Sequence, residues 1–205
     1  MPKESVVLGI AGIFFGLLVG WIVGSQQSTP RSTAAPSAPG VAQQTQAPVR
    51  VDEKRASDLR ATAERNPADA GVRVQLANLY FDAERFQEAA TWYEEALKIN
   101  PRDADASTDL GIAYYYMNQP DRALEQFEQS LAANPNHSKT YLNIGVVRAF
   151  GKQDLEGAAR AWQKVIEIAP DSPEGRAAKQ ALEGVRNAHP GVGAPGEEAG
   201  KPAKQ

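Results

Sequence analysis

The sequence predicts an all-α protein, in which a solenoid of helical hairpins follows one membrane-spanning helix and a disordered linker. Three observations lead to this prediction: similar side chains recur every 34 residues, prolines recur at nearly the same interval, and one N-terminal stretch is apolar and uncharged. Recurrence at a fixed period of 20–50 residues is typical of repeat proteins. The expected order is a cap at 1–4, a transmembrane signal anchor at 5–24, a linker at 25–50, a repeat domain at 51–187 and a disordered tail at 188–205.

Composition excludes several classes of function. The chain has 22 basic and 25 acidic residues, a formal net charge of -3 and no cysteine, and its two histidines, His137 and His189, lie far apart in sequence. A balanced charge lacks the basic patch expected for nucleic-acid binding, and without cysteine there is no thiol chemistry or cysteine-based metal site. None of the common catalytic or nucleotide-binding motifs occurs. We therefore predict no catalytic residues, no cofactor, no metal and no nucleic-acid partner.

The N-terminal apolar stretch has the length of a membrane helix. From Val6 to Val23 the eighteen residues carry no charge, and as a helix they extend about 27 Å, close to the thickness of the hydrocarbon core. Lys3 precedes the stretch and the next cation is Arg31, so the positive-inside rule favours a cytoplasmic N-terminus. We predict that residues 5–24 insert in the lipid bilayer and place the repeat domain outside the cytoplasm, in a bacterial periplasm. A cleaved signal peptide is the alternative.

Glycines recur at every fourth position of this stretch, at Gly12, Gly16, Gly20 and Gly24. Residues four apart lie on one side of a helix, and small residues there allow a second membrane helix to approach closely. This face is a candidate for self-association or for pairing with another membrane helix. The alternative is that glycine is simply common in membrane helices.

The linker and the tail have compositions that do not support a core. Residues 25–50 are mostly Pro, Ala, Gln, Ser and Thr without an aromatic residue, and the tail is rich in Gly and Pro. Such chains bury too little apolar surface to offset the loss of conformational entropy on ordering. The linker is therefore expected to hold the next domain away from the membrane.

Between these segments the same kinds of side chain return at fixed intervals. The repeat length is 34 residues in the first two copies, and one extra residue enters the third copy after Phe150. Because proline cannot continue a helix, the recurrent prolines mark helix ends. Corresponding positions are Leu76, Leu110 and Ile144; Ala77, Gly111 and Gly145; Ala89, Ala123 and Ala158; Tyr93, Phe127 and Trp162; and Pro67, Pro101, Pro135 and Pro170.

Each copy is expected to form two antiparallel helices, with Asp69, Asp103 and Ser138 as N-caps of the first helix. A lone helix before Pro67 and a polar capping helix at 172–187 are expected to close the two ends of the stack. The predicted helix pairs are 70–82 with 86–99, 104–117 with 120–133, and 138–150 with 154–168.

This pattern resembles the tetratricopeptide repeat, W-x2-L-G-x2-Y, then A-x3-F, then P, over 34 residues. The resemblance covers about residues 70–170, with repeats at 70–103, 104–137 and 138–171. The tryptophan position holds Arg73, Ser107 and Tyr141, and the first tyrosine position of the third copy holds Arg148. The extra residue near Gly151 makes the geometry of the third turn an open question.

The resemblance implies a binding module whose first helices line a groove for peptides. The residues it places there are Val74, Asn78, Phe81, Thr108, Ile112, Tyr115, Tyr116, Lys139, Leu142 and Val146, with Asp82, Asp105, Ala149 and Phe150 at the same repeat positions. We expect the groove to be apolar and aromatic, with Tyr115 as the leading contact because Tyr114 already occupies the core position. Val74 and Asp109 stand where a clamp for a C-terminal carboxylate needs Lys and Asn, so we predict no such clamp. In the alternative, the aromatic residues are core and the capping helix fills the groove.

The leading hypothesis is a non-enzymatic, membrane-anchored adaptor that binds a protein or peptide partner. A narrower hypothesis is an assembly factor for an envelope complex, such as those of cytochrome c biogenesis, which the general layout resembles. A third is a regulatory subunit that oligomerises through the glycine face of its membrane helix.

Overall fold

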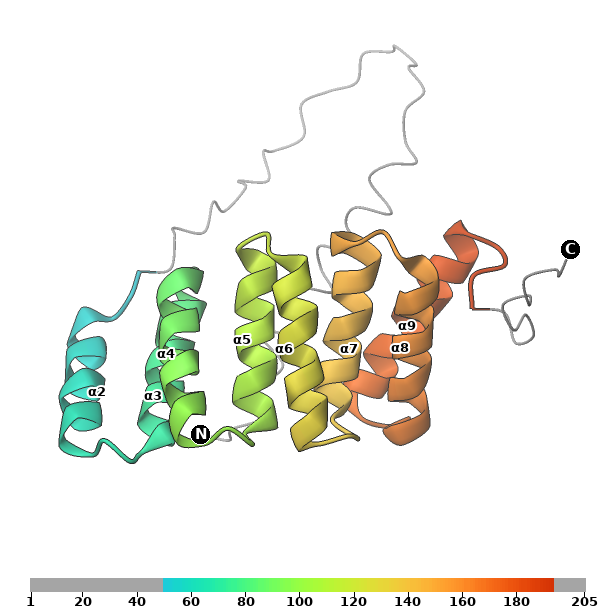
Figure 1. Ribbon diagram of the computed structural model, residues 1–205. Helices are drawn as coiled ribbons and strands as arrows, with labels where there is room; N and C mark the ends of the chain where they lie inside the picture. The colour runs from blue at the N-terminus through green and yellow to red at the C-terminus, as the bar shows by residue number, and fades with distance from the viewer. Residues whose placement is uncertain (1–49, 194–205) are drawn as a thin grey trace, which may run out of the picture. The chain divides into compact units, whose positions relative to one another are not determined.

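Residues 50–193 are described by a computed structural model, and within this range the chain forms eight α-helices and one π-helical turn, without a β-strand. Successive helices lie side by side in chain order (Figure 1). The predicted all-α helical-hairpin solenoid is thus confirmed. The elements are α2 (Glu53–Arg65), α3 (Ala70–Asp82), α4 (Phe86–Ile99), α5 (Ala104–Tyr116), α6 (Pro120–Ala133), α7 (Ser138–Val146), η1 (Val147–Gly151), α8 (Leu155–Ile168) and α9 (Pro173–Ala188).

Predictions for the N-terminal region fall outside this description. The proposed membrane segment at 5–24, its four glycines and nearly all of the linker precede Arg50, and the end of the tail follows Gly193. Of the helices that are described, none combines the length and apolar character needed to cross a bilayer.

Aspartates begin the first helices of the first two hairpins. The Asp69 carboxylate accepts a hydrogen bond from the backbone N–H of Val72 at 3.3 Å, and Asp103 accepts one from Ala106 at 2.9 Å. Both predicted N-caps are confirmed, since each satisfies a backbone donor that has no partner inside the helix. The prediction for Ser138 was wrong by one residue. His137 is the N-cap of α7 and makes no side-chain capping bond, because its ring is bonded to another side chain, as described below.

The second and third hairpins each pair a glycine on the first helix with a large ring on the second helix. A Cβ atom added to Gly111 would lie 2.4 Å from Phe127 Cε1, and one added to Gly145 would lie 2.1 Å from Trp162 Nε1. Both rings are completely buried. The recurrent glycine and the recurrent ring are therefore two halves of one contact, in which only a hydrogen atom fits opposite the ring.

The extra residue of the third copy is absorbed by the π-helical turn η1, where Lys152 N–H bonds to the carbonyl of Val147. In the first hairpin the closing bond of the turn runs from Arg85 N–H to Tyr80 O, five residues back, whereas in the third it runs from Asp154 N–H to Arg148 O, six residues back. All three turns still contain one residue in the left-handed region. These residues are Glu84, Asn118 and Gln153, with φ of 59°, 58° and 56°.

Lone helices cover both ends of the stack, as predicted. At the N-terminal end, α2 buries Ala56 and Ala63. At the C-terminal end, α9 buries Ala178 and Leu182 in a core cluster shared with Trp162 on α8. Terminal helices of this kind keep the last apolar surfaces of a solenoid away from water.

Candidate binding groove

The first helices α3, α5 and α7 carry all the residues predicted to contact a ligand, but the structure leaves only some of them accessible. Thr108, Ile112 and Val146 are buried, with 0%, 5% and 9% of their surface exposed. Ligand contact does not fit these three positions, because neighbouring helices cover them. The other predicted contacts are half-buried or exposed: Val74, Asn78, Phe81, Tyr115, Tyr116, Lys139 and Leu142.

Four aromatic rings form a cluster where the first helices end, and we name this cluster the aromatic edge: Phe81, Phe86, Tyr115 and Tyr116. The Phe86 and Tyr116 rings are stacked, with centroids 4.5 Å apart and planes at 6°. Phe81 meets both of these rings edge-on, at 5.2 Å and 5.7 Å, and Tyr115 lies 6.2 Å from Tyr116. Tyr116 is 36% exposed. The edge is thus an ordered aromatic surface that links the first two hairpins and remains open to solvent.

Phe86 was missed by the sequence reasoning because it belongs to a second helix. It is the first residue of α4, directly after the turn that follows Phe81. The sequence nevertheless contained a pattern that indicates this contact, since a turn brings the start of the second helix beside the end of the first. An aromatic residue on each side of that turn indicates that the two rings meet.

The third hairpin extends this surface through its π-helical turn. A Cβ atom added to Gly151 would lie 3.1 Å from the Tyr115 ring and 3.0 Å from Pro120, so the turn lies directly against α5 and α6. Next to Gly151, Phe150 is 45% exposed. Large exposed apolar side chains gathered in one place commonly mark interaction sites. Phe150 is therefore an exposed ring next to the turn that lies against α5 and α6.

Both tyrosines of the edge are uncharged at neutral pH. Burial raises the pKa of the Tyr116 phenol to about 12, with smaller contributions from Tyr115 and Glu84. Burial also raises the pKa of Tyr115. The edge offers an apolar surface with hydroxyl groups that can donate hydrogen bonds, a combination frequent in interfaces.

Several polar side chains on the first helices already have hydrogen-bond or ion-pair partners within the protein. The Tyr93 hydroxyl donates to Asn78 Oδ1 at 2.5 Å, and Lys139 Nζ lies 2.7 Å from Asp109 Oδ1. Asn143 Nδ2 donates to the backbone carbonyl of Lys139 at 2.8 Å. Lys139 is therefore already paired with a carboxylate of α5.

Burial and the charge of the partner shift the pKa of Asp109 in opposite directions, and the same holds for the pKa of Lys139. Burial raises the pKa of Asp109, and Lys139 only partly counters it. For Lys139, burial lowers the pKa, but the carboxylates of Asp109, Asp105 and Glu174 together outweigh this effect and raise it. Lys139 is therefore a firmly protonated group among several carboxylates.

Thr108 is buried because three hydroxyl groups meet between α5, α6 and α7. Thr108 Oγ1 lies 2.9 Å from Ser130 Oγ and 2.7 Å from Thr140 Oγ1, and the latter two are 2.8 Å apart. His137 Nδ1 lies 2.7 Å from Thr140 Oγ1, while His137 Nε2 lies 3.3 Å from the Asp105 carboxylate and its hydrogen bond lowers the pKa of Asp105. The cluster connects three helices through a fully satisfied polar network.

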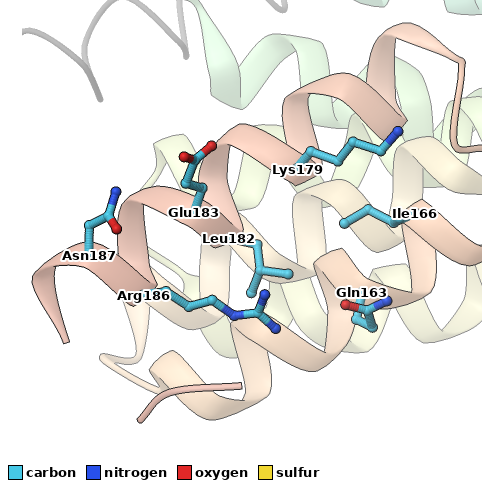
Figure 2. Close-up of a pocket in the computed structure, with 7 residues that line it drawn as sticks. All are labelled: Gln163, Ile166, Lys179, Leu182, Glu183, Arg186 and Asn187. Atoms are coloured by element: carbon cyan, nitrogen blue, oxygen red, sulfur yellow. The ribbon is translucent and has the colours of Figure 1, made fainter. Parts of the chain in front are cut away.

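A separate open depression of about 360 Å³ lies between α8 and α9. Figure 2 shows Lys179, Glu183 and Arg186 projecting from α9 around it, with Ile166 and Gln163 on α8. It lies at the end of the stack, not among the first helices of the three hairpins, and its charged rim is typical of a capping helix. Within residues 50–193, no group of three or more His, Cys, Asp and Glu side chains is arranged to hold a metal ion.

Comparisons with known proteins agree with this architecture. Two family models, both described as tetratricopeptide repeat, match residues 69–136 and 108–173, which together span about half of the chain. No curated protein matches the sequence.

Solved structures with a similar fold include a crystal structure of MamA, which is 18% identical with a TM-score of 0.58 over 65% of this chain and 75% of that one. A second is described as the first TPR of Spaghetti (RPAP3) bound to the HSP90 peptide SRMEEVD; it is 26% identical, with a TM-score of 0.53 over 58% of this chain and 94% of the other. A third is the Arabidopsis OM64 TPR domain, 18% identical with a TM-score of 0.51 over 56% and 94% of the two chains. The first and third share the fold at low sequence identity.

Proposed function

Because residues 69–173 of this chain belong to the tetratricopeptide repeat family, we propose that the protein is a non-enzymatic adaptor that holds a protein partner on its first helices. The observation that carries this proposal is the aromatic edge. Its rings pack against one another, yet Tyr116 remains 36% exposed. A role in the core would explain why these rings pack against one another but not why Tyr116 is exposed, whereas a role in docking a partner explains both.

A peptide or amphipathic helix with an apolar stripe is the partner that such a surface accepts. A structure with a similar fold is described as binding the HSP90 peptide SRMEEVD, which supports peptide binding as the general mode. The chemistry here is different, because Lys139 is bonded to Asp109 and the accessible surface is aromatic. Recognition therefore depends on apolar contact and not on capture of a terminal carboxylate.

The test is loss of peptide binding when the Tyr116 ring of the edge is removed together with Leu142, a half-buried predicted contact on α7. We expect Tyr116→Ala combined with Leu142→Ala to weaken binding of a fluorescent helical peptide with a Leu and Phe stripe at least about 10-fold, because truncating aromatic anchors of an interface typically costs 2 kcal/mol or more. Fluorescence anisotropy with the full chain in a mild non-ionic detergent measures the affinity.

Ile99→Ala is the matched control, because Ile99 is exposed to the same extent as Tyr116, 36%, but lies at the end of a second helix. We expect it to leave the affinity unchanged. Equal affinities of all three proteins would mean that the rings serve only the fold and that the proposed groove is not a binding site.

Anchoring in a bilayer through residues 5–24, with the repeats outside the cytoplasm, completes the proposal. It is supported by the uncharged stretch from Val6 to Val23, whose length matches the hydrocarbon core. We expect the full chain to stay with membranes during alkaline carbonate extraction and a chain that starts at residue 25 to be released. Release of the full chain under the same conditions would contradict anchoring and leave the peptide-binding role unaffected.

A further inference from the structure

The charge around the aromatic edge narrows the class of partner. Four carboxylates lie on the first helices and the capping helix, and we name this set the carboxylate row: Asp82, Asp105, Asp109 and Glu174. Asp105 and Asp109 lie one turn apart on α5, and Asp109 lies 2.7 Å from Lys139 on α7, which packs against α9. Asp82 and Asp109 both raise the pKa of the Tyr93 phenol, after burial, the largest cause. Asp105, Asp109 and Glu174 all act on Lys139. The row thus crosses α3, α5, α7 and α9.

Two cations near this row, Lys139 and Arg148, are paired with carboxylates. Lys139 lies 2.7 Å from Asp109, and Arg55 on α2 acts on Asp82, whose pKa is nevertheless raised by burial. Arg148 on η1 bonds instead to Asp154 at the start of α8. Asp105 keeps 74% of its side chain exposed. Beyond these pairs, the strip presents negative charge to an approaching ligand.

On α5 the aromatic edge and the carboxylate row are separated by a distance that suits a helix, whereas on α3 Asp82 directly follows Phe81 of the edge. Along α5, Tyr116 lies eleven positions after Asp105, which corresponds to about 16 Å at 1.5 Å per residue. An α-helix with its side chains is about 10–12 Å across. A helix lying across the first helices can therefore contact aromatic rings with one flank and carboxylates with the other.

From these observations we propose that the groove selects a cationic amphipathic helix of a partner protein, whose apolar stripe docks on the aromatic edge and whose flanking Lys or Arg side chains face the carboxylate row. The proposal rests on the proposed function and specifies its ligand. It also excludes acidic segments, since like charges in a partly desolvated groove repel. The acidic peptide SRMEEVD of the similar structure belongs to the excluded class.

Two synthetic helical peptides with identical Leu and Phe stripes test the inference, one with Lys and one with Glu on the flank. We expect the full chain to bind the Lys peptide about 10-fold more tightly than the Glu peptide at low salt. The preference should shrink in 1 M salt, where the Debye length is about 3 Å. The charge variant combines Asp82→Asn, Asp105→Asn and Glu174→Gln. We expect it to reduce the preference for the Lys peptide to about 2-fold or less, because the Lys peptide then loses its attraction to the row and the Glu peptide loses its repulsion.

A control variant makes the same change of net charge elsewhere. It combines Glu64→Gln on α2 with Glu125→Gln and Glu128→Gln on α6. These positions are exposed and lie outside the first helices of the hairpins, so this variant should keep the wild-type preference for the Lys peptide. Equal binding of the Lys and Glu peptides, or a preference that both variants lose alike, would overturn the inference. If the inference fails but Tyr116→Ala with Leu142→Ala still weakens binding of both peptides, the proposed peptide-binding function stands without the charge preference. Failure of both peptides to bind the wild-type chain would overturn both the proposed function and this inference.

Discussion

Trp162→Ala is expected to lower the free energy of unfolding by about 3–5 kcal/mol and Gly145→Ala by about 1–3 kcal/mol, while the double variant loses less than Trp162→Ala alone. Trp162 is completely buried and its Nε1 donates to the carbonyl of Leu142 at 3.2 Å, so its removal leaves a cavity and deletes this hydrogen bond. A methyl group at residue 145 collides with the indole, at 2.1 Å. Once the indole is absent the collision is absent too, and alanine then stabilises α7 by up to about 1 kcal/mol relative to glycine.

Denaturant unfolding followed by circular dichroism at 222 nm gives the three free energies. Gly184→Ala is the control, because Gly184 lies within α9 and a Cβ atom there meets nothing within 4 Å. This substitution should be neutral or stabilising by up to about 1 kcal/mol. Simple addition of the two single losses in the double variant would contradict the direct contact between the glycine and the ring.

The repeat in the sequence predicted that Gly145 is a small core residue and Trp162 a large one, but not that the two meet within one hairpin. A small residue and a ring return at corresponding positions in each copy, at Gly111 with Phe127 and at Gly145 with Trp162. A role that every copy repeats is set by the geometry within one hairpin. Local patterns therefore determined the helices, their caps at Asp69 and Asp103, and the small and large halves of each core contact.

Features that arise between hairpins or in a single copy could not be derived in this way. The repeat pattern places Thr108 in the groove, yet Ser130 and Thr140, from two further helices, close over it. Sequence also showed that the third copy contains an extra residue, but not that the backbone would absorb it as a π-helical turn. Such turns are frequent at functional sites, and this one carries the exposed ring of Phe150.

For Thr108, the structure and the repeat pattern predict opposite outcomes of one substitution. We expect Thr108→Val to lower the free energy of unfolding by about 1–3 kcal/mol, because it keeps the shape of the side chain but leaves the buried Ser130 and Thr140 hydroxyls short of a partner. The affinity of the folded protein for the peptide with the Leu and Phe stripe should be unchanged, since Thr108 has no exposed surface. A groove contact would show the reverse result, with weaker binding at unaltered stability.

Thr108→Ser separates the hydroxyl group from the methyl group. Serine retains a donor and acceptor for Ser130 and Thr140, so its cost should be limited to the lost methyl group, about 1 kcal/mol. If Thr108→Val loses more unfolding free energy than Thr108→Ser, and both variants bind the peptide equally, Thr108 belongs to the hydroxyl network that holds α5 against α6 and α7. That network matters for binding only indirectly, because α5 carries Tyr116 and α7 leads into Phe150. A peptide affinity that falls about 10-fold in Thr108→Val, with stability equal to that of Thr108→Ser, would instead return Thr108 to the ligand-contacting set.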